Sequence, residues 1–335
     1  MEQYTGATKG YFAAYQANDA IMALAMEDKY GVVSTKNYQQ VRLTGENFRA
    51  QTQTARPDEI NSLAEASQSV ITQVAVSGTL TGALSYGTYD DLLAAVVCGD
   101  WQGNVLKNDK MVKTWTITER MGDRYFIRSG SFCTKAQLTF SQGNFASVEF
   151  DFTCAKQDSS DTSPASITPV NDNLIINTLS NFKNISFDDQ VFTSGTRELT
   201  LTIERNGSAS DYAMGSIEAV GIRPGETQLS AQVQVFFNNW NLYHKYENGW
   251  RGKIVAEIQD DNGQGYKFTI LNALLTNPVI NAGSKNSSIV ATFDIDAGPQ
   301  AGGGTIQIER FKPQQPTPPQ PTKPEQTAST TEDEK

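Results

Sequence analysis

The sequence predicts a mainly β protein made of two tandem copies of one β–β–α–β–β–β unit, followed by a disordered tail. Three observations predict this fold class. Apolar and polar residues alternate through most of the chain, each half holds one short amphipathic helix, and the elements around both helices follow the same order. We expect an N-terminal arm at 1–17, a first copy at 18–156, a linker at 157–173, a second copy at 174–311 and the tail at 312–335.

Alternation with a period of two residues predicts the strands, because successive side chains of a strand point to opposite faces of a sheet. The stretch 147–154 is the clearest example. It places Val148, Phe150 and Phe152 on one face, and Glu149 and Asp151 on the other. The same alternation occurs at 74–82, 113–119, 135–141, 197–205, 229–237, 252–259, 266–275 and 288–296.

The first short helix is predicted to begin at Thr88, whose side chain can cap it. Asp91 stands three residues later, which is the spacing of a capping box. Gly99 is expected to end the helix in a left-handed conformation. The apolar face and the tryptophan that follows it consist of Leu92, Leu93, Val96 and Trp101.

The second short helix repeats this pattern, with Asn239 as the expected cap and Gly249 as the expected end. Its apolar face and following tryptophan consist of Leu242, Tyr243, Tyr246 and Trp250. Around both helices the order of strands is the same, and the two copies end in EFDF at 149–152 and TFDI at 292–295. A tandem duplication explains this repetition; the alternative is two β-rich halves that resemble each other by chance.

Two segments read as irregular chain. Residues 312–335 hold six of the 12 prolines and no aromatic residue, so they cannot bury enough surface to offset the entropy of ordering. We expect an extended, mobile tail there. Residues 155–173 are rich in Ser, Asp, Thr and Pro, which predicts a linker.

The composition excludes several classes of function. A net charge of −10 over 335 residues argues against a protein that grips nucleic acid by neutralising phosphates. The beginning of the chain lacks the pattern of a signal peptide, and no apolar run is long enough to cross a bilayer, so we expect a soluble protein made in a cytoplasm. The three cysteines, Cys98, Cys133 and Cys154, are expected to be free buried thiols, with a Cys133–Cys154 pair as the alternative.

The residues that enzymes and metal sites need are sparse. The single histidine, His244, would have to serve any catalytic triad, and no second histidine or cysteine pair completes a zinc site. The sequence at 260–265 has part of a calcium-loop pattern, but it lacks the later glutamate and reads as a hairpin turn. We therefore expect no enzyme activity, no cofactor and no metal.

With these elements in place, the sequence resembles the major tail tube proteins of long-tailed, non-contractile bacteriophages. The resemblance rests on the strand–helix–Gly–Trp unit and on the stretches AIMALAMEDKYGVVST (20–35), KTWTITERMGDRYFIRSGSFCTKAQLTFSQGNFASVEFDF (113–152) and GETQLSAQVQVFFNNWNLYHKYENG (225–249). It covers about 18–311. The resemblance implies a β-sandwich or half-barrel flanked by a helix in each copy.

The resemblance also implies an assembly. Such subunits close into rings whose inner strands form one β-barrel around a pore for DNA, and the rings stack along an axis. Because the chain carries two copies, we expect three chains in a pseudo-six-fold ring, with a true hexamer as the alternative. The expected partners are the chain itself and other tail proteins at the tube ends. DNA would pass without specific binding, no membrane is involved, and the expected location is the virion tail, assembled in the host cytoplasm.

Two groups of site residues follow from this interpretation. Acidic residues on the polar strand faces are candidates for the pore lining, where they would repel phosphates; ordinary solvent-facing carboxylates are the alternative. These residues are Glu149, Asp151, Asp294 and Asp296. The polar segment 49–69, with its counterpart at 205–226, is a candidate contact between rings; a plain surface loop is the alternative. Its charged residues are Arg49, Arg56, Asp58 and Glu59.

Three rival interpretations stay open from the sequence alone. A carbohydrate- or receptor-binding β-module of a virion could use exposed aromatic residues such as Trp240 and Tyr243. An enzyme on a β-sandwich is disfavoured by the missing catalytic residues. The tube of a type VI secretion system is disfavoured because its subunits usually hold a single copy of the unit.

Overall fold

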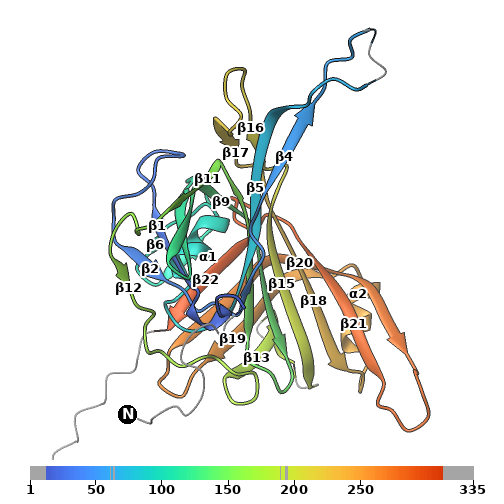
Figure 1. Cartoon of the computed structure of the whole chain (residues 1–335). Coiled ribbons are helices and arrows are strands. Elements are labelled where there is room, and N and C mark those ends of the chain that lie inside the picture. Colours follow the sequence, from blue (N-terminus) through green and yellow to red (C-terminus); the bar gives the residue numbers. More distant parts are fainter. Residues whose placement is uncertain (1–12, 61, 63–64, 189, 193–194, 312–335) are drawn as a thin grey trace, which may run out of the picture.

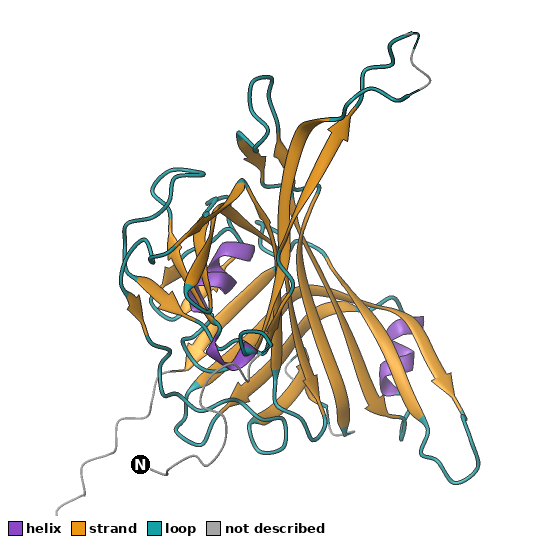
Figure 2. Cartoon of the chain, viewed as in Figure 1, coloured by secondary structure: helices purple, strands orange, loops and turns teal. Residues whose placement is uncertain are grey.

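The structure is a computed structural model that describes residues 13–60, 62, 65–188, 190–192 and 195–311. The expected tail at 312–335 and most of the expected N-terminal arm lie outside the described residues. The prediction of a mainly β protein is confirmed (Figure 2). Within the described residues the helices are one 3-10 turn, Ala17–Asp19, and two short α-helices, α1 (Asp90–Val96) and α2 (Asn241–Glu247).

Eight strands form one continuous antiparallel sheet, here called the long sheet, which crosses Figure 1 from the upper hairpin to the lower right. Most of these strands alternate buried and solvent-facing residues, as half-buried strands do, whereas β4 is exposed along its whole length. In spatial order the strands are β4 (Arg49–Ala55), β5 (Val70–Ala83), β10 (Ser147–Cys154), β9 (Arg124–Ser141), β15 (Thr196–Asn206), β18 (Glu226–Phe236), β21 (Val290–Ala297) and β20 (Gly265–Asn281).

Shorter strands form a second layer over the apolar side of the long sheet. In the first half they are β1 (Ile21–Met26), β2 (Tyr38–Gln40), β8 (Trp115–Met121), β11 (Lys156–Ser160) and β12 (Ile167–Thr168). In the second half they are β13 (Phe182–Phe187), β14 (Gln190–Val191), β19 (Arg251–Gln259) and β22 (Ile306–Phe311). The remaining strands are β3 (Gly45–Glu46), β6 (Trp101–Gln102), β7 (Val105–Lys107), β16 (Ala209–Asp211) and β17 (Gly221–Arg223).

The pairing order is the same in both halves. In the second layer β1–β8–β9–β11 corresponds to β13–β19–β20–β22, and in the long sheet β4–β5–β10–β9 corresponds to β15–β18–β21–β20. The strands β9 and β20 are long because each begins in the second layer and continues into the long sheet. Their register against the second-layer strands β8 and β19 shifts where they cross over, in the way that β-bulges bend a strand. This arrangement is the one that two tandem copies would produce.

The two halves are joined edge to edge. Strand β9 of the first half pairs with β15 of the second along seven residue pairs, from Lys135↔Glu204 to Ser141↔Glu198. A second junction forms between β22 and β7. The expected linker is partly strand, because 156–160 is β11 and pairs with β9, and 167–168 is β12 and pairs with β2.

One main hydrophobic core lies between the two layers and runs through both halves. Its largest fully buried side chains include Tyr89, Phe150, Phe187, Phe293 and Tyr266. The three cysteines are free and buried, so the alternative of a Cys133–Cys154 bond is excluded. Burial raises the pKa of the Cys154 thiol to about 11, which keeps it protonated and unreactive near neutral pH.

The expected caps of the first helix are wrong. Helix α1 begins at Asp90, and Thr88 Oγ1 instead lies 2.6 Å from Ser85 Oγ. The left-handed residue after the helix is Cys98, with φ of 50°, not Gly99. Glycine is needed at 99 for space, because a Cβ there would lie 2.1 Å from the carbonyl oxygen of Lys107.

The second helix follows its prediction in part. Its N-cap is Trp240 and not the expected Asn239, although Asn239 Oδ1 accepts a hydrogen bond from Asn241 N, the first residue of the helix, at 3.0 Å. Gly249 is left-handed as expected, with φ of 59°. The two tryptophans, however, are not equivalent. Trp101 begins the hairpin β6–β7, which has no counterpart after α2, whereas Trp250 directly precedes β19.

Candidate functional site

The solvent-facing side of the long sheet is mostly polar, with a few exposed apolar residues such as Val279 toward its ends. Side chains directly opposite each other in paired strands point to the same face, so the register assigns this face without ambiguity. It is dominated by Thr, Ser and Gln. Among the described residues, the carboxylates on it are Glu149, Asp151, Glu198, Glu204, Glu226, Asp294 and Asp296, and the cations are Arg49 and Lys135.

The four acidic residues singled out from the sequence all lie on this face. Asp151 accepts a hydrogen bond from Thr79 Oγ1 at 2.6 Å, and Lys135 Nζ lies 3.4 Å from Glu149 and 3.7 Å from Asp151. These ion pairs are partly exposed, and exposed pairs contribute little to stability. The carboxylates therefore leave the face acidic without being required for folding.

In the second half Asp294 occupies the equivalent place. Its carboxylate accepts hydrogen bonds from Gln232 Nε2 at 2.8 Å and from Asn277 Nδ2 at 3.1 Å, and none of the described cations forms an ion pair with it. Asp296 is exposed two residues further along β21. Glu198 and Glu204 also lie on this face but were not among the acidic candidates from the sequence. The alternation of 197–205 already placed them on the opposite face from the apolar residues of that strand.

The long sheet ends in two strands with open edges. Within the described residues, β4 pairs with β5 alone, and the part of β20 beyond Leu274 pairs with β21 alone. Each therefore presents unpaired backbone N–H and C=O groups along one side, which is a template for pairing with another chain. Pro278, which has no N–H, lies in the bulge of β20, where a strand tolerates proline.

Two segments project from one end of the long sheet (Figure 1). The expected inter-ring loop at 49–69 is in part the strand β4, in which Arg49 is paired opposite Ser77; Arg56, Asp58 and Glu59 follow the strand and are exposed. Its expected counterpart at 205–226 contains the small β16–β17 sheet. Both projections leave the same end, as the prediction of a shared role requires.

The two helices differ in how well they are covered. In α1, Leu92, Leu93 and Val96 are buried, as predicted. In α2, only Leu242 is buried; Tyr243 is half-buried, and Tyr246 is 36% exposed. Trp240, which precedes α2, is 55% exposed and packs against Tyr243 with ring centroids 5.3 Å apart. The aromatic side of α2 is thus left open in the single chain.

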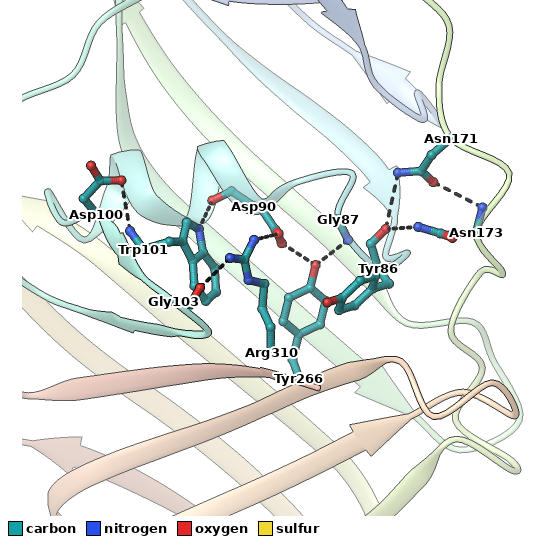
Figure 3. A network of polar contacts seen from close by, with 10 residues as sticks. All are labelled: Tyr86, Gly87, Asp90, Asp100, Trp101, Gly103, Asn171, Asn173, Tyr266 and Arg310. Carbon is teal, nitrogen blue, oxygen red and sulfur yellow. Dashed lines mark hydrogen bonds and ion pairs between the residues drawn. The ribbon is translucent and has the colours of Figure 1, made fainter. Parts of the chain in front are cut away.

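A polar network covers α1 from the second half of the chain (Figure 3). Asp90 accepts a hydrogen bond from the Tyr266 hydroxyl at 2.6 Å and forms an ion pair with Arg310 at 2.6 Å. The guanidinium of Arg310 lies 4.0 Å from the ring centroid of Trp101, whose Nε1 donates to the Asp90 carbonyl oxygen at 3.0 Å. Burial and the neighbouring Asp90 raise the pKa of Tyr266 well above its ordinary value, so it stays a hydrogen-bond donor.

His244 is exposed on α2 and contacts Glu247 at 3.0 Å. The described residues contain no group of three His, Cys, Asp or Glu that could hold a metal ion. Over the same residues, no helix is long and apolar enough to span a membrane.

A protein-family model described as phage tail tube protein matches residues 17–307. No curated protein matches the chain. The matched span holds both helices and every strand of the long sheet. Because the match covers most of the chain, the chain belongs to the phage tail tube protein family, a family of structural tail proteins.

Proposed function

We propose that the chain is the tube subunit of a long, non-contractile, siphovirus-type tail, in which copies close into rings and the rings stack around a pore for DNA. The observation that carries this proposal is the pair of open edges at the two ends of one long sheet. A closed barrel is the arrangement that removes such edges altogether. Each copy would supply one edge to each of its two neighbours.

The size of the sheet supports a small number of copies in a ring. Each chain contributes eight strands, so three chains give a barrel of about 24 strands and a backbone diameter of ~50 Å. That size leaves an open bore, since barrels with fewer strands already enclose channels. Six chains would roughly double the diameter. We therefore favour a trimer with pseudo-six-fold symmetry over a hexamer.

The polar face of the long sheet would line the bore, because the opposite face is occupied by the core and the second layer. A wall of Thr, Ser, Gln and carboxylates offers phosphates few cations to bind, so DNA would pass without being held. The two projecting segments would contact the next ring, and other tail proteins would bind the ends of the tube. The subunits would assemble in the host cytoplasm and function in the virion tail.

Negative-stain imaging of the purified full chain tests this proposal. We expect rings or hollow filaments of uniform width as the protein concentration rises. A control chain that carries Pro in place of Thr52 and Val279, one substitution at each open edge, should stay monomeric. A wild-type chain that remains a monodisperse monomer at high concentration would contradict the proposal.

A further inference from the structure

The junction between β9 and β15 inside each chain shows how one unit joins the next. The two strands are antiparallel, with Gln137 opposite Thr202 and Leu138 opposite Leu201. On the apolar side, Leu138 and Leu201 are 0% and 3% exposed, so the junction closes the core completely. If the two halves are copies of one unit, the same junction should form again between the second half of one chain and the first half of another.

The strand register identifies the equivalent residues. Asp151 and Asp294 lie at the same point of the EFDF and TFDI motifs, and β5 and β18 flank them in the same way. Two residues before the partners of these aspartates, β5 has Ser77 and β18 has Ser230, so these two serines are equivalent. Ser77 lies opposite Arg49 and Ser230 lies opposite Thr202, which makes Arg49 the equivalent of Thr202. The strands β3 and β4 follow one another along β5 in a single register, so together (β3–β4) they correspond to β15.

The other edge is matched in the same manner. Gln137 lies opposite Glu149 in the first half, and Val279 lies opposite Thr292 in the second. The end of β20, beyond its bulge, thus corresponds to the end of β9. Both equivalents of the paired strands β9 and β15 are open edges in the single chain.

Building on the proposed function, we propose that β20 of one copy pairs antiparallel with β3–β4 of the next in the register of the internal junction. The predicted opposite residues are Val279 with Arg49, Ile280 with Phe48, and Asn281 with Asn47. The partner of each open edge is thus a second copy of this chain, held in one defined register.

The side chains at the two edges suit this pairing. Ile280 and Phe48 are partly buried apolar residues at the margins of the core, in the places that Leu138 and Leu201 occupy at the internal junction. Pairing in the proposed register brings these two exposed margins together and excludes water from both. On the polar side, Val279 and Arg49 would replace Gln137 and Thr202.

The difference between the helices is explained by the same register. Helix α1 packs on β9 and also contacts β15, which belongs to the second half. Helix α2 packs on β20, the equivalent of β9, but among the described residues no strand of its own chain pairs with the open edge of β20 in the way that β15 pairs with β9. In the ring, β3–β4 of the next copy would take that place. The exposed ring of Trp240 and the half-exposed rings of Tyr243 and Tyr246 would then be covered by the neighbour.

Cysteine pairs in the full chain test the register. The matched pairs are N281C with N47C and V279C with R49C; the displaced pairs, N281C with R49C and V279C with N47C, use the same four substitutions. Opposite residues have Cβ atoms about 4.5–5.5 Å apart and diagonal ones about 7–8 Å, while a disulfide needs about 3.5–4.5 Å. The native cysteines are buried and should not interfere.

Under mild oxidation of assembled protein, we expect both matched variants to form covalent oligomers at least about tenfold faster than the displaced ones, with a closed ring as the largest product. If rings are seen by imaging but a displaced pair links as fast or faster, the register is wrong and the proposed function survives. If neither rings nor links between chains form in any variant, both proposals fail together.

Discussion

Replacing Asp90 with alanine is expected to loosen the attachment between the two halves of the chain. The Asp90 carboxylate contacts Tyr266 and Arg310, which lie on β20 and β22 of the second half, while Asp90 itself begins α1 of the first half. The substitution removes both contacts and leaves their partners in place. It therefore measures the network that covers α1 (Figure 3).

The expected loss of unfolding free energy follows from the two side chains, Tyr266 and Arg310, that lose Asp90 as a partner. Tyr266 is fully buried, so its hydroxyl loses the only acceptor it donates to, which costs about 1–3 kcal/mol. The Arg310 side chain is 23% exposed and keeps its contacts with Trp101 and the Gly103 carbonyl. Losing its ion pair with Asp90 therefore adds no more than about 1 kcal/mol. We expect a total loss of about 1–4 kcal/mol in the free energy of unfolding.

The assay is urea unfolding of the monomeric chain, with Asp91→Ala as the matched control. Asp91 is the next residue on the same helix and forms no ion pair among the described residues; burial and the neighbouring Asp90 raise the pKa of its carboxyl, so its replacement should not destabilise the chain. In a chain with Tyr266→Phe, which has no hydroxyl to strand, Asp90→Ala should cost about 1–2 kcal/mol less. Equal costs for Asp90→Ala and Asp91→Ala would refute the reasoning.

Three further predictions concern the bore, the projections and a buried carboxylate. Converting Asp151 and Asp294 to Lys should leave tubes intact but slow DNA ejection, measured by single-particle release assays; the control pair Asp172→Lys and Asp261→Lys carries the same charge change away from the long sheet, and equal ejection rates would remove these residues from the bore. Replacing 57–68 by a short turn should permit rings but prevent filaments in negative stain, and normal tubes would exclude a stacking role. Burial raises the pKa of Glu27, whose carboxylate accepts hydrogen bonds from Gly31 N, Gly130 N, Thr114 and Thr116. The native state then holds this proton more tightly than the unfolded state, so the contribution of Glu27 to stability is present below the ordinary pKa and is lost as pH rises through the folded one. Urea midpoints should fall over that window in the wild type and less in Glu27→Gln; identical slopes would contradict this account.

Much of the fold could be predicted from the sequence because strands of a half-buried sheet alternate visibly. The stretch 147–154 gave both the strand β10 and the face on which Glu149 and Asp151 lie. The same rule placed Asp294 and Asp296, so all four acidic candidates fall on one face of the long sheet. Their place in a bore stays a prediction.

The rest depends on contacts between distant residues, which no local pattern contains. Thr88 has the side chain of a cap, but its hydroxyl is taken by Ser85, so α1 begins later. Gly99 was assigned to a left-handed position when the carbonyl of Lys107 is what excludes a side chain there. The segment 155–173 has the composition of a linker, yet β9 and β2 offer it strand partners.

The repetition itself was visible, but the pairing that gives it meaning was not. Sequence alone shows that Trp101 and Trp250 follow similar helices, and their places in the fold turn out to differ. The pairing of β9 with β15 joins residues that no motif connects, such as Leu138 and Leu201. Once this junction is known, the strands β4 and β20 are left as the open edges of the long sheet.

The most direct test of the central idea, that one chain supplies two adjacent units of a ring, is the number of chains in a ring. Native mass spectrometry of isolated rings, together with the rotational symmetry of tube cross-sections, measures it. We predict three chains per ring and three-fold symmetry with six similar lobes. A ring of six chains, with each chain repeating once around a six-fold axis, would contradict it.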